Sequence, residues 1–285
     1  MLKAERISTI LSLTLILYCA VLIESIALLS RLVNRVLPVS SLFLLLNLII
    51  LGAVSDHAQA QYWWNASREP VGLAPDPAAT PEAIVQVYGA RAYSWRGYLG
   101  IHTWIAVKPA LAKSYTIYEV IGWLQRRKMP VLVIYENVPD RRWYGNMPEI
   151  LLEKRGDGVD ALIEKIDQAA RNYPYARNYT IWPGPNSNTF TAWVFRAVPE
   201  LQLDLPPTAI GKDYLGYRMI SRAPSGSGLQ ISVFGLMGVL FSAVEGIEFN
   251  FLGLSFGVDL DPLAIKLPLV GRKELDSGSK PVIEQ

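Results

Sequence analysis

Two apolar stretches near the N-terminus restrict this chain more than any other feature of its sequence. Residues 7–30 and 37–54 contain very few charged side chains, and a helix that crosses a membrane needs about 20 predominantly apolar residues. Only a short segment with two arginines, RLVNRV, separates them. We therefore predict a transmembrane helical hairpin within a membrane anchor at residues 1–60, with the lipid bilayer as a partner. Two buried core helices are the alternative, which these lengths disfavour.

The charges and aromatic residues beside the two stretches bear on how the anchor sits in a membrane. Trp63 and Trp64 follow the second stretch, as aromatic residues do at a membrane interface. The rule that basic residues stay on the cytoplasmic side gives nearly a tie. The basic residues that balance one another are Lys3 and Arg6 before the first stretch and Arg31 and Arg35 after it.

Charge and residue usage exclude several classes of function. The formal net charge is +2 and basic residues never form a long run, so nucleic acid is not an expected partner. The doublet Arg141-Arg142 is interpreted as part of a solvated loop. With a single cysteine, Cys19, and two distant histidines, His57 and His102, the chain offers neither a disulfide nor a His/Cys metal site. It also lacks the glycine motifs that bind phosphate, so we expect no metal and no cofactor.

The middle of the chain has the pattern of an α+β domain. Residues 61–82 are rich in proline and alanine and are interpreted as a linker. Apolar residues recur at helical spacing in 158–173 and 188–198, each closed by a proline. Short runs rich in β-branched and aromatic residues predict strands at 83–92, 98–108, 115–123, 130–136 and 179–182. We therefore predict a domain at 83–220 with a mostly antiparallel sheet and two packed helices.

The C-terminal part, 221–272, is a glycine-rich apolar extension. Its segment 228–260 is apolar enough to be considered as a third membrane segment. Glu245, Glu248 and Asn250 interrupt it, which favours strands or a segment lying against a membrane over a spanning helix. Residues 273–285 are interpreted as a polar, disordered tail.

A histidine and a glutamate stand on consecutive predicted strands. If the hairpin between them turns about the bond from residue 110 to 111, His102 lies opposite Glu119. Residues directly opposed in an antiparallel pair have Cβ atoms about 5 Å apart. A carboxylate at that distance is expected to orient the imidazole and to raise its pKa.

Ser187 lies at the start of the predicted helix 188–198, where free backbone N–H groups could form an oxyanion hole. A serine nucleophile needs a base, and His102 is the candidate imidazole. We therefore consider a catalytic set of Ser187, His102 and Glu119, with Asn186, Asn188 and Thr189 in support. The alternative stays open, because asparagine and serine are favoured helix caps and a lone histidine in an aromatic strand is often structural.

A long set of motifs resembles a bacterial family of membrane-anchored proteins known as a domain of unknown function. The resemblance spans about residues 70–272 and is specific. It implies a bacterial inner-membrane protein, with the periplasmic side slightly favoured for the soluble part. The motifs that carry it are GLAPDPAATPEAIVQVYGAR, WRG, HTWIAVKP, YEVIGW, WYGNMPEILLEKRG, WPGPNSNTF, LPPTAIGKDY and KLPLVGR.

A second resemblance concerns the order of the candidate site residues. A histidine strand, then a polar residue on the next strand, then a nucleophile at a later helix start resembles circularly permuted papain-like hydrolases, which include envelope peptidoglycan amidases. Their Asn-Cys-Asn motif corresponds to residues 186–188, with Ser187 in place of cysteine. This implies an amide or ester hydrolase or acyltransferase acting on peptidoglycan or an acyl lipid. The alternative is a non-catalytic, membrane-anchored binding or assembly module on the same scaffold.

Overall fold

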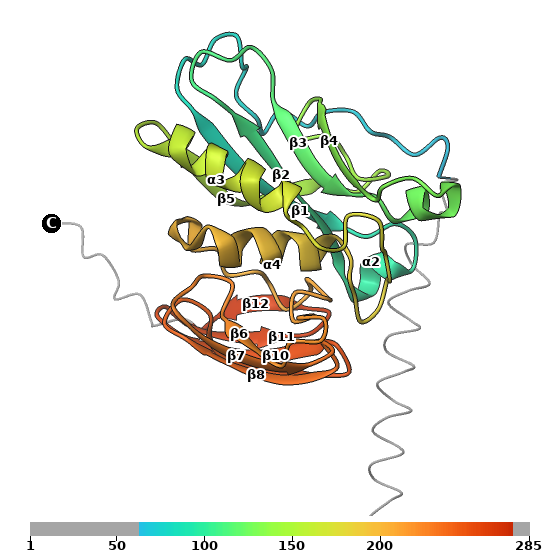
Figure 1. Cartoon of the computed structure of the whole chain (residues 1–285), viewed down its shortest axis with the longest axis vertical. Helices are drawn as coiled ribbons and strands as arrows, with labels where there is room; N and C mark the ends of the chain where they lie inside the picture. The colour runs from blue at the N-terminus through green and yellow to red at the C-terminus, as the bar shows by residue number, and fades with distance from the viewer. Residues whose placement is uncertain (1–62, 276–285) are drawn as a thin grey trace, which may run out of the picture. The chain divides into compact units, whose positions relative to one another are not determined.

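A computed structural model describes residues 63–275 as three layers: a five-stranded sheet, a layer of helices, and a seven-stranded sheet (Figure 1). The predicted α+β class is confirmed, with two antiparallel sheets instead of one. The predicted anchor helices at 7–30 and 37–54, and the tail from residue 276, lie outside the described residues. Within 63–275, no helix combines the length and the apolar character needed to cross a bilayer.

The first sheet contains five antiparallel strands in the order β4-β3-β2-β1-β5. Four of them fall within predicted strands. The fifth, β5, was missed because its sequence PEILLEKR mixes apolar and charged residues, as suits an edge strand that pairs only with β1. The bounds are β1 Ile84–Arg91, β2 Ile101–Lys108, β3 Thr116–Val120, β4 Leu132–Glu136 and β5 Pro148–Arg155.

The two faces of this sheet are covered by different parts of the chain. Side chains alternate along a strand, so Val87 and Ile105 face the helices, whereas Tyr88 and Trp104 belong to a second buried cluster on the other face. The segment before β1 packs beside that second cluster, with the Leu73 N–H donating to Asp140 Oδ2 at 2.6 Å. Much of the predicted linker 61–82 is therefore part of the folded domain.

Two main helices form the middle layer, as the sequence predicts. They are α3 Val159–Arg171 and α4 Ser187–Ala197. Short helical turns lie at α2 Arg96–Leu99, η1 Gly122–Arg127 and η2 Pro199–Leu201. The predicted strand at 179–182 is wrong: this segment is irregular, and its Thr180 N–H bonds the carbonyl of Pro185 instead of a neighbouring strand.

The second sheet is a meander in which each strand pairs with its neighbours in sequence, from β6 to β12. It confirms strands in the segment 228–260, and β12 continues two residues into the predicted tail. The bounds are β6 Ile220–Arg222, β7 Gly228–Val233, β8 Met237–Ser242, β9 Gly246–Phe251, β10 Leu254–Leu260, β11 Leu263–Leu267 and β12 Gly271–Glu274.

The polarity of the second sheet is inverted, because most of the side chains that face the helices are polar. Asp213 accepts hydrogen bonds from Gln230 at 2.5 Å, Asn250 at 2.7 Å and Ser255 at 2.9 Å. From α4, Arg196 donates to Gln230 at 2.6 Å. The polar residues that interrupt the apolar segment are thus the buried face of the sheet.

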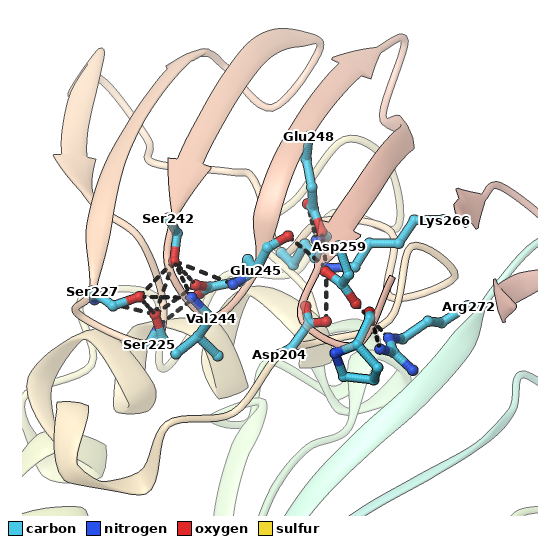
Figure 2. Close-up of polar contacts among 12 residues, drawn as sticks. Asp204, Ser225, Ser227, Ser242, Val244, Glu245, Glu248, Asp259, Lys266 and Arg272 are labelled. Carbon is cyan, nitrogen blue, oxygen red and sulfur yellow. Dashed lines mark hydrogen bonds and ion pairs between the residues drawn. The ribbon is translucent and has the colours of Figure 1, made fainter. Parts of the chain in front are cut away.

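A buried ionic cluster holds the same face at β9–β12 (Figure 2). Lys266 is fully buried, and its Nζ lies 2.7 Å from Asp204, 2.9 Å from Glu248 and 2.9 Å from Asp259. Glu248 also pairs with Lys212. Burial alone would lower the pKa of Lys266, but the surrounding carboxylates outweigh it and raise this pKa.

We expect Lys266→Ala to destabilise the full chain by roughly 3–5 kcal/mol, because it leaves buried carboxylates without their cation. The measurement is denaturant unfolding of the protein in detergent. Lys165→Ala is the matched control, since its pair with Glu200 is about half exposed and an exposed pair contributes about 0–1 kcal/mol. Equal effects of the two substitutions would contradict this account of the cluster.

Candidate functional site

His102 and Glu119 meet on the face of the first sheet that is turned away from the helices. The imidazole Nε2 lies 3.0 Å from Glu119 Oε1. The strands pair Ile105 with Tyr118, so Glu119 aligns with Trp104 and the predicted pairing of 102 with 119 is wrong by two residues. A slip of two residues keeps side chains on the same face. The contact therefore forms diagonally.

The turn explains the shifted register. Pairing of residue 105 with 118 centres the hairpin one residue later than the sequence suggested. Leu111 occupies the left-handed region there, with φ of 62°. Nothing in the residue type of Leu111 indicates that conformation, because it is glycine and asparagine that usually adopt it.

Glu119 is the centre of the site and is completely buried. Its Oε2 accepts hydrogen bonds from the Tyr135 hydroxyl at 2.7 Å and from Arg141 at 2.6 Å. Burial alone would raise the pKa of Glu119, but the hydrogen bond from His102 and the Arg141 guanidinium lower it below its ordinary value. The carboxylate is therefore ionised and fully partnered.

The electrostatics of His102 differ from the sequence-based expectation. Burial lowers the pKa of the imidazole, and this effect outweighs the opposite effect of Glu119, while Arg141 lowers the pKa further. The expectation of a raised pKa is therefore wrong. A neutral imidazole beside an ionised carboxylate carries its proton on Nε2, which assigns the tautomer.

Aromatic rings enclose the histidine. Trp143 stacks on the imidazole with ring centroids 3.7 Å apart and planes 8° apart, and Trp104 lies at 5.8 Å. Trp143, Arg141 and Tyr135 were not among the predicted site residues. Arg141 was assigned to a solvated loop, yet it is buried against Glu119. The sequence signal that could have identified this pair is the position of Arg141 two residues before Trp143, because a buried Glu119 needs a cation beside it.

Ser187 lies on the opposite side of the sheet from His102. Thr103, the neighbour of His102 on β2, donates to Asn188 at 2.9 Å and shares a hydrogen bond with Thr191 of α4. Because neighbouring residues point to opposite faces, the imidazole faces away from α4. Within residues 63–275, no hydrogen bond joins the Ser187 hydroxyl to His102. The predicted convergence of the three groups is not formed.

The start of α4 is closed by a capping box. Asn186 Oδ1 accepts from the backbone N–H groups of Asn188 at 3.0 Å and Thr189 at 3.1 Å. In return Thr189 Oγ1 accepts from the Asn186 N–H at 3.1 Å. These amides are occupied, so they do not form the predicted oxyanion hole. The structure therefore agrees with the alternative that this motif caps the helix, and Asn186 is the capping residue.

The cap is also fastened to a later loop. Asn186 Nδ2 donates to the carbonyl of Ile210 at 3.0 Å, and Asn188 Nδ2 donates to the same carbonyl at 2.8 Å. A Cβ on Gly211 would come within 2.3 Å of the Asn186 amide, and φ at Gly211 is 97°. The motifs NSN and IGKD therefore contact each other through hydrogen bonds and close packing, and both have a structural role.

A hollow of about 540 Å³ lies on the same side of the first sheet as His102. Three segments line it, from residues 70–77, 113–115 and 136–140. Its volume is in the range of ligand sites. Tyr115 belongs both to its lining and to the buried cluster that contains Trp104. Among residues 63–275, no group of three or more His, Cys, Asp or Glu side chains is placed to hold a metal ion.

Comparison with known proteins finds a family model that matches part of this domain. The model of a family described as "Protein of unknown function (DUF3750)" matches residues 82–214. This part of the chain is similar to that family, which bears out the predicted resemblance to a domain of unknown function. A search of curated proteins and a search of solved structures each found no match.

We expect Asn186→Ala to destabilise the full chain by about 1–2 kcal/mol, because helix α4 loses its cap. Ser187→Ala is the matched control. The Ser187 hydroxyl makes no hydrogen bond within the described part of the chain, so its loss should cost about 0.5 kcal/mol or less. Denaturant unfolding in detergent measures both. A larger loss in the serine variant would contradict the assignment.

We expect the imidazole of His102 to titrate below its ordinary pKa of about 6.5. The unfolded chain then binds the proton more readily, so the stability that His102 contributes is present above about pH 6.5 and is lost as pH falls toward its folded pKa. Proton NMR of a His57→Gln variant, which leaves one histidine, measures the midpoint. A midpoint at or above 6.5 would show that Glu119 outweighs burial.

Proposed function

We propose that this chain is a binding module tethered to the bacterial inner membrane, and that it holds an amine-bearing peptide in the 540 Å³ hollow. The observation that carries this proposal is the hollow itself, on the side of the sheet where His102 is held. The separation of Ser187 from His102 by the sheet favours binding over hydrolysis. The predicted hydrolase or acyltransferase activity is the alternative.

The lining of the hollow favours a ligand that donates hydrogen bonds. Four prolines, Pro70, Pro75, Pro77 and Pro139, contribute no N–H groups to it. Three carboxylates line it against one lysine, and they are Asp76, Glu136 and Asp140 against Lys113. Such a surface is rich in acceptors and negative in charge. A protonated amine on a peptide satisfies both properties.

Peptidoglycan is the envelope polymer that matches this chemistry, because its stem peptides carry amide N–H groups and a free amine. An acyl lipid matches less well, since its chain offers no donor to the carboxylates and needs a wide apolar lining. We therefore propose the stem peptide as ligand and the periplasmic face as location.

The histidine and its partners have a positioning role in this proposal. Glu119 holds Tyr135 and Arg141, and these two residues bracket segment 136–140, one wall of the hollow. Trp104 Nε1 donates to the carbonyl of Pro139 at 2.8 Å in the same wall. The permuted papain-like scaffold stays part of the proposal only through the order of histidine strand, acid strand and later helix, because the helix start does not face the histidine.

The test is calorimetric titration of the full chain in detergent with a soluble stem tetrapeptide that bears a free side-chain amine. We expect binding, and we expect Glu136→Gln to weaken it by up to about fivefold, as the loss of one exposed ion pair does. Glu149→Gln, an exposed glutamate on β5 outside the hollow, is the matched control. The same peptide with its amine acetylated should bind to wild type about as weakly as the free peptide binds to the Glu136→Gln variant.

Equal affinity for the free and the acetylated peptide would overturn the assignment of the ligand. The catalytic alternative has its own readout, which is labelling by a serine-directed fluorophosphonate. We expect no labelling of wild type. Labelling that both Ser187→Ala and His102→Ala abolish would restore the hydrolase interpretation and overturn the binding module.

A further inference from the structure

The outward face of the second sheet is apolar and exposed. Because side chains alternate, the strands that turn Gln230, Ser232, Glu248 and Asn250 inward turn their apolar residues outward. We call the outward residues of β7–β11 the outer face. Its most prominent members are Ile231, Phe241, Phe249, Phe251, Phe256 and Leu263.

The outer face is larger than the apolar patches found on ordinary soluble proteins. Phe241, Phe249, Phe251 and Phe256 are each about half exposed. With about 200 Å² for each aromatic side chain, these four alone present on the order of 400 Å². The largest patch on a typical monomer is about 300–600 Å², and the aliphatic residues of the outer face add to this sum. A face of this size indicates an interaction surface.

The hairpin turns at one end of the sheet extend the apolar surface. Phe234 and Leu252 occupy the left-handed region, with φ of 52° and 51°, and each precedes a glycine with positive φ. Asparagine or aspartate is the favoured residue at such a position, because bulky residues are strained there. Both side chains are about half exposed, as is Val270 in the third turn at this end. Apolar side chains thus stand where the backbone disfavours them.

Basic residues flank the end that carries these turns. Arg91 donates to the carbonyl of Leu269 at 3.3 Å, and Arg96 follows in α2. Arg218 follows Tyr217, whose ring packs against Phe234 at 6.1 Å. At the opposite end, the turn between β10 and β11 carries the exposed Asp261. Apolar tips with arginines beside them are complementary to acyl chains and anionic headgroups.

The connection to the N-terminal part favours lipid over other occupants. Eight residues lie between position 54, the end of the second apolar stretch, and position 63, where the described chain begins. Fully extended, the nine steps from position 54 to position 63 reach about 30 Å. If the stretch lies in a bilayer, the domain is confined near the surface of that bilayer. A second copy of the chain docked on the outer face would contact the flat part of the sheet only. The apolar turns and the arginines at the end of the sheet would then have no role.

We infer that the outer face and the turns at Phe234, Leu252 and Val270 dock on the surface of the bilayer that anchors the chain. The apolar tips enter the boundary between headgroups and acyl chains, and Arg91, Arg96 and Arg218 contact anionic headgroups. This inference rests on the membrane anchoring in the proposed function and is independent of peptide binding in the hollow.

The test uses the full chain with Cys19→Ser and one new cysteine, either Phe249→Cys or Val270→Cys, each labelled with an environment-sensitive fluorophore. The protein is reconstituted in vesicles of phosphatidylcholine and phosphatidylglycerol. Doxyl-labelled lipids should quench the labels at 249 and 270 about twofold or more, as they quench interfacial groups. Glu149→Cys on β5 of the first sheet is the matched control and should stay unquenched.

A second variant separates docking from folding. Phe234→Asn with Leu252→Asn places a favoured residue at both turns, so the unfolding temperature in detergent should be retained or raised. Quenching at 270 should fall by about half, because two apolar tips are lost. Unchanged quenching at 270 would overturn the role of the turns.

Each remaining outcome is also decisive. Vesicle-bound protein whose labels at 249 and 270 are quenched by iodide in water, and not by doxyl lipid, overturns docking while the anchoring stands. Protection that disappears as the lipid-to-protein ratio is raised, without doxyl quenching, identifies a second copy as the occupant and overturns the inference. Protein that does not float with vesicles refutes the anchoring itself. Failure of the stem peptide to bind leaves all these readouts unchanged.

Discussion

The polar layer between α4 and the second sheet determines how the C-terminal half of the domain meets its surroundings. Lys266, Asp213 and Arg196 bind inward side chains of the meander, so most of the inward positions are polar and have partners. A strand has only two sides, so its apolar residues must then point outward. The exposed apolar surface is therefore a direct result of buried hydrogen bonds and ion pairs, and it does not reflect a poorly packed core.

The same rule of alternation separates the two halves of the predicted catalytic set. His102 and Thr103 are neighbours on β2, and they serve opposite faces: one binds Glu119 and the other binds α4. A one-residue difference in the strand would have placed an imidazole beside the helix start. As it is, the helix start is held by hydroxyl and amide side chains, and the imidazole belongs to the cluster of Trp143, Arg141 and Tyr135.

The sequence predicts local features of this domain better than its long-range ones. Helices α3 and α4 follow from apolar periodicity and closing prolines, and the contact of His102 with Glu119 follows from strand alternation. The exact register did not follow, because it depends on the left-handed Leu111. Arg141 and Tyr135 were missed because their partner lies on another strand and only tertiary folding joins them. The inverted sheet was recognisable as strands, but its inward side depends on Asp204, Lys212 and Asp213, which precede it in the chain.

The meander has a consequence for how the protein is made. Its strands pair only with sequence neighbours, so their hairpins close short loops and form at little entropic cost. Yet each hairpin has an inward side whose polar residues need hydrogen-bond or ionic partners, and an outward side that is apolar. Arg196, Asp204, Lys212 and Asp213 all precede the first strand of the meander, so a chain growing from its N-terminus presents these partners before the hairpins emerge. The order of synthesis therefore makes the partners of the inward side available when the hairpins form.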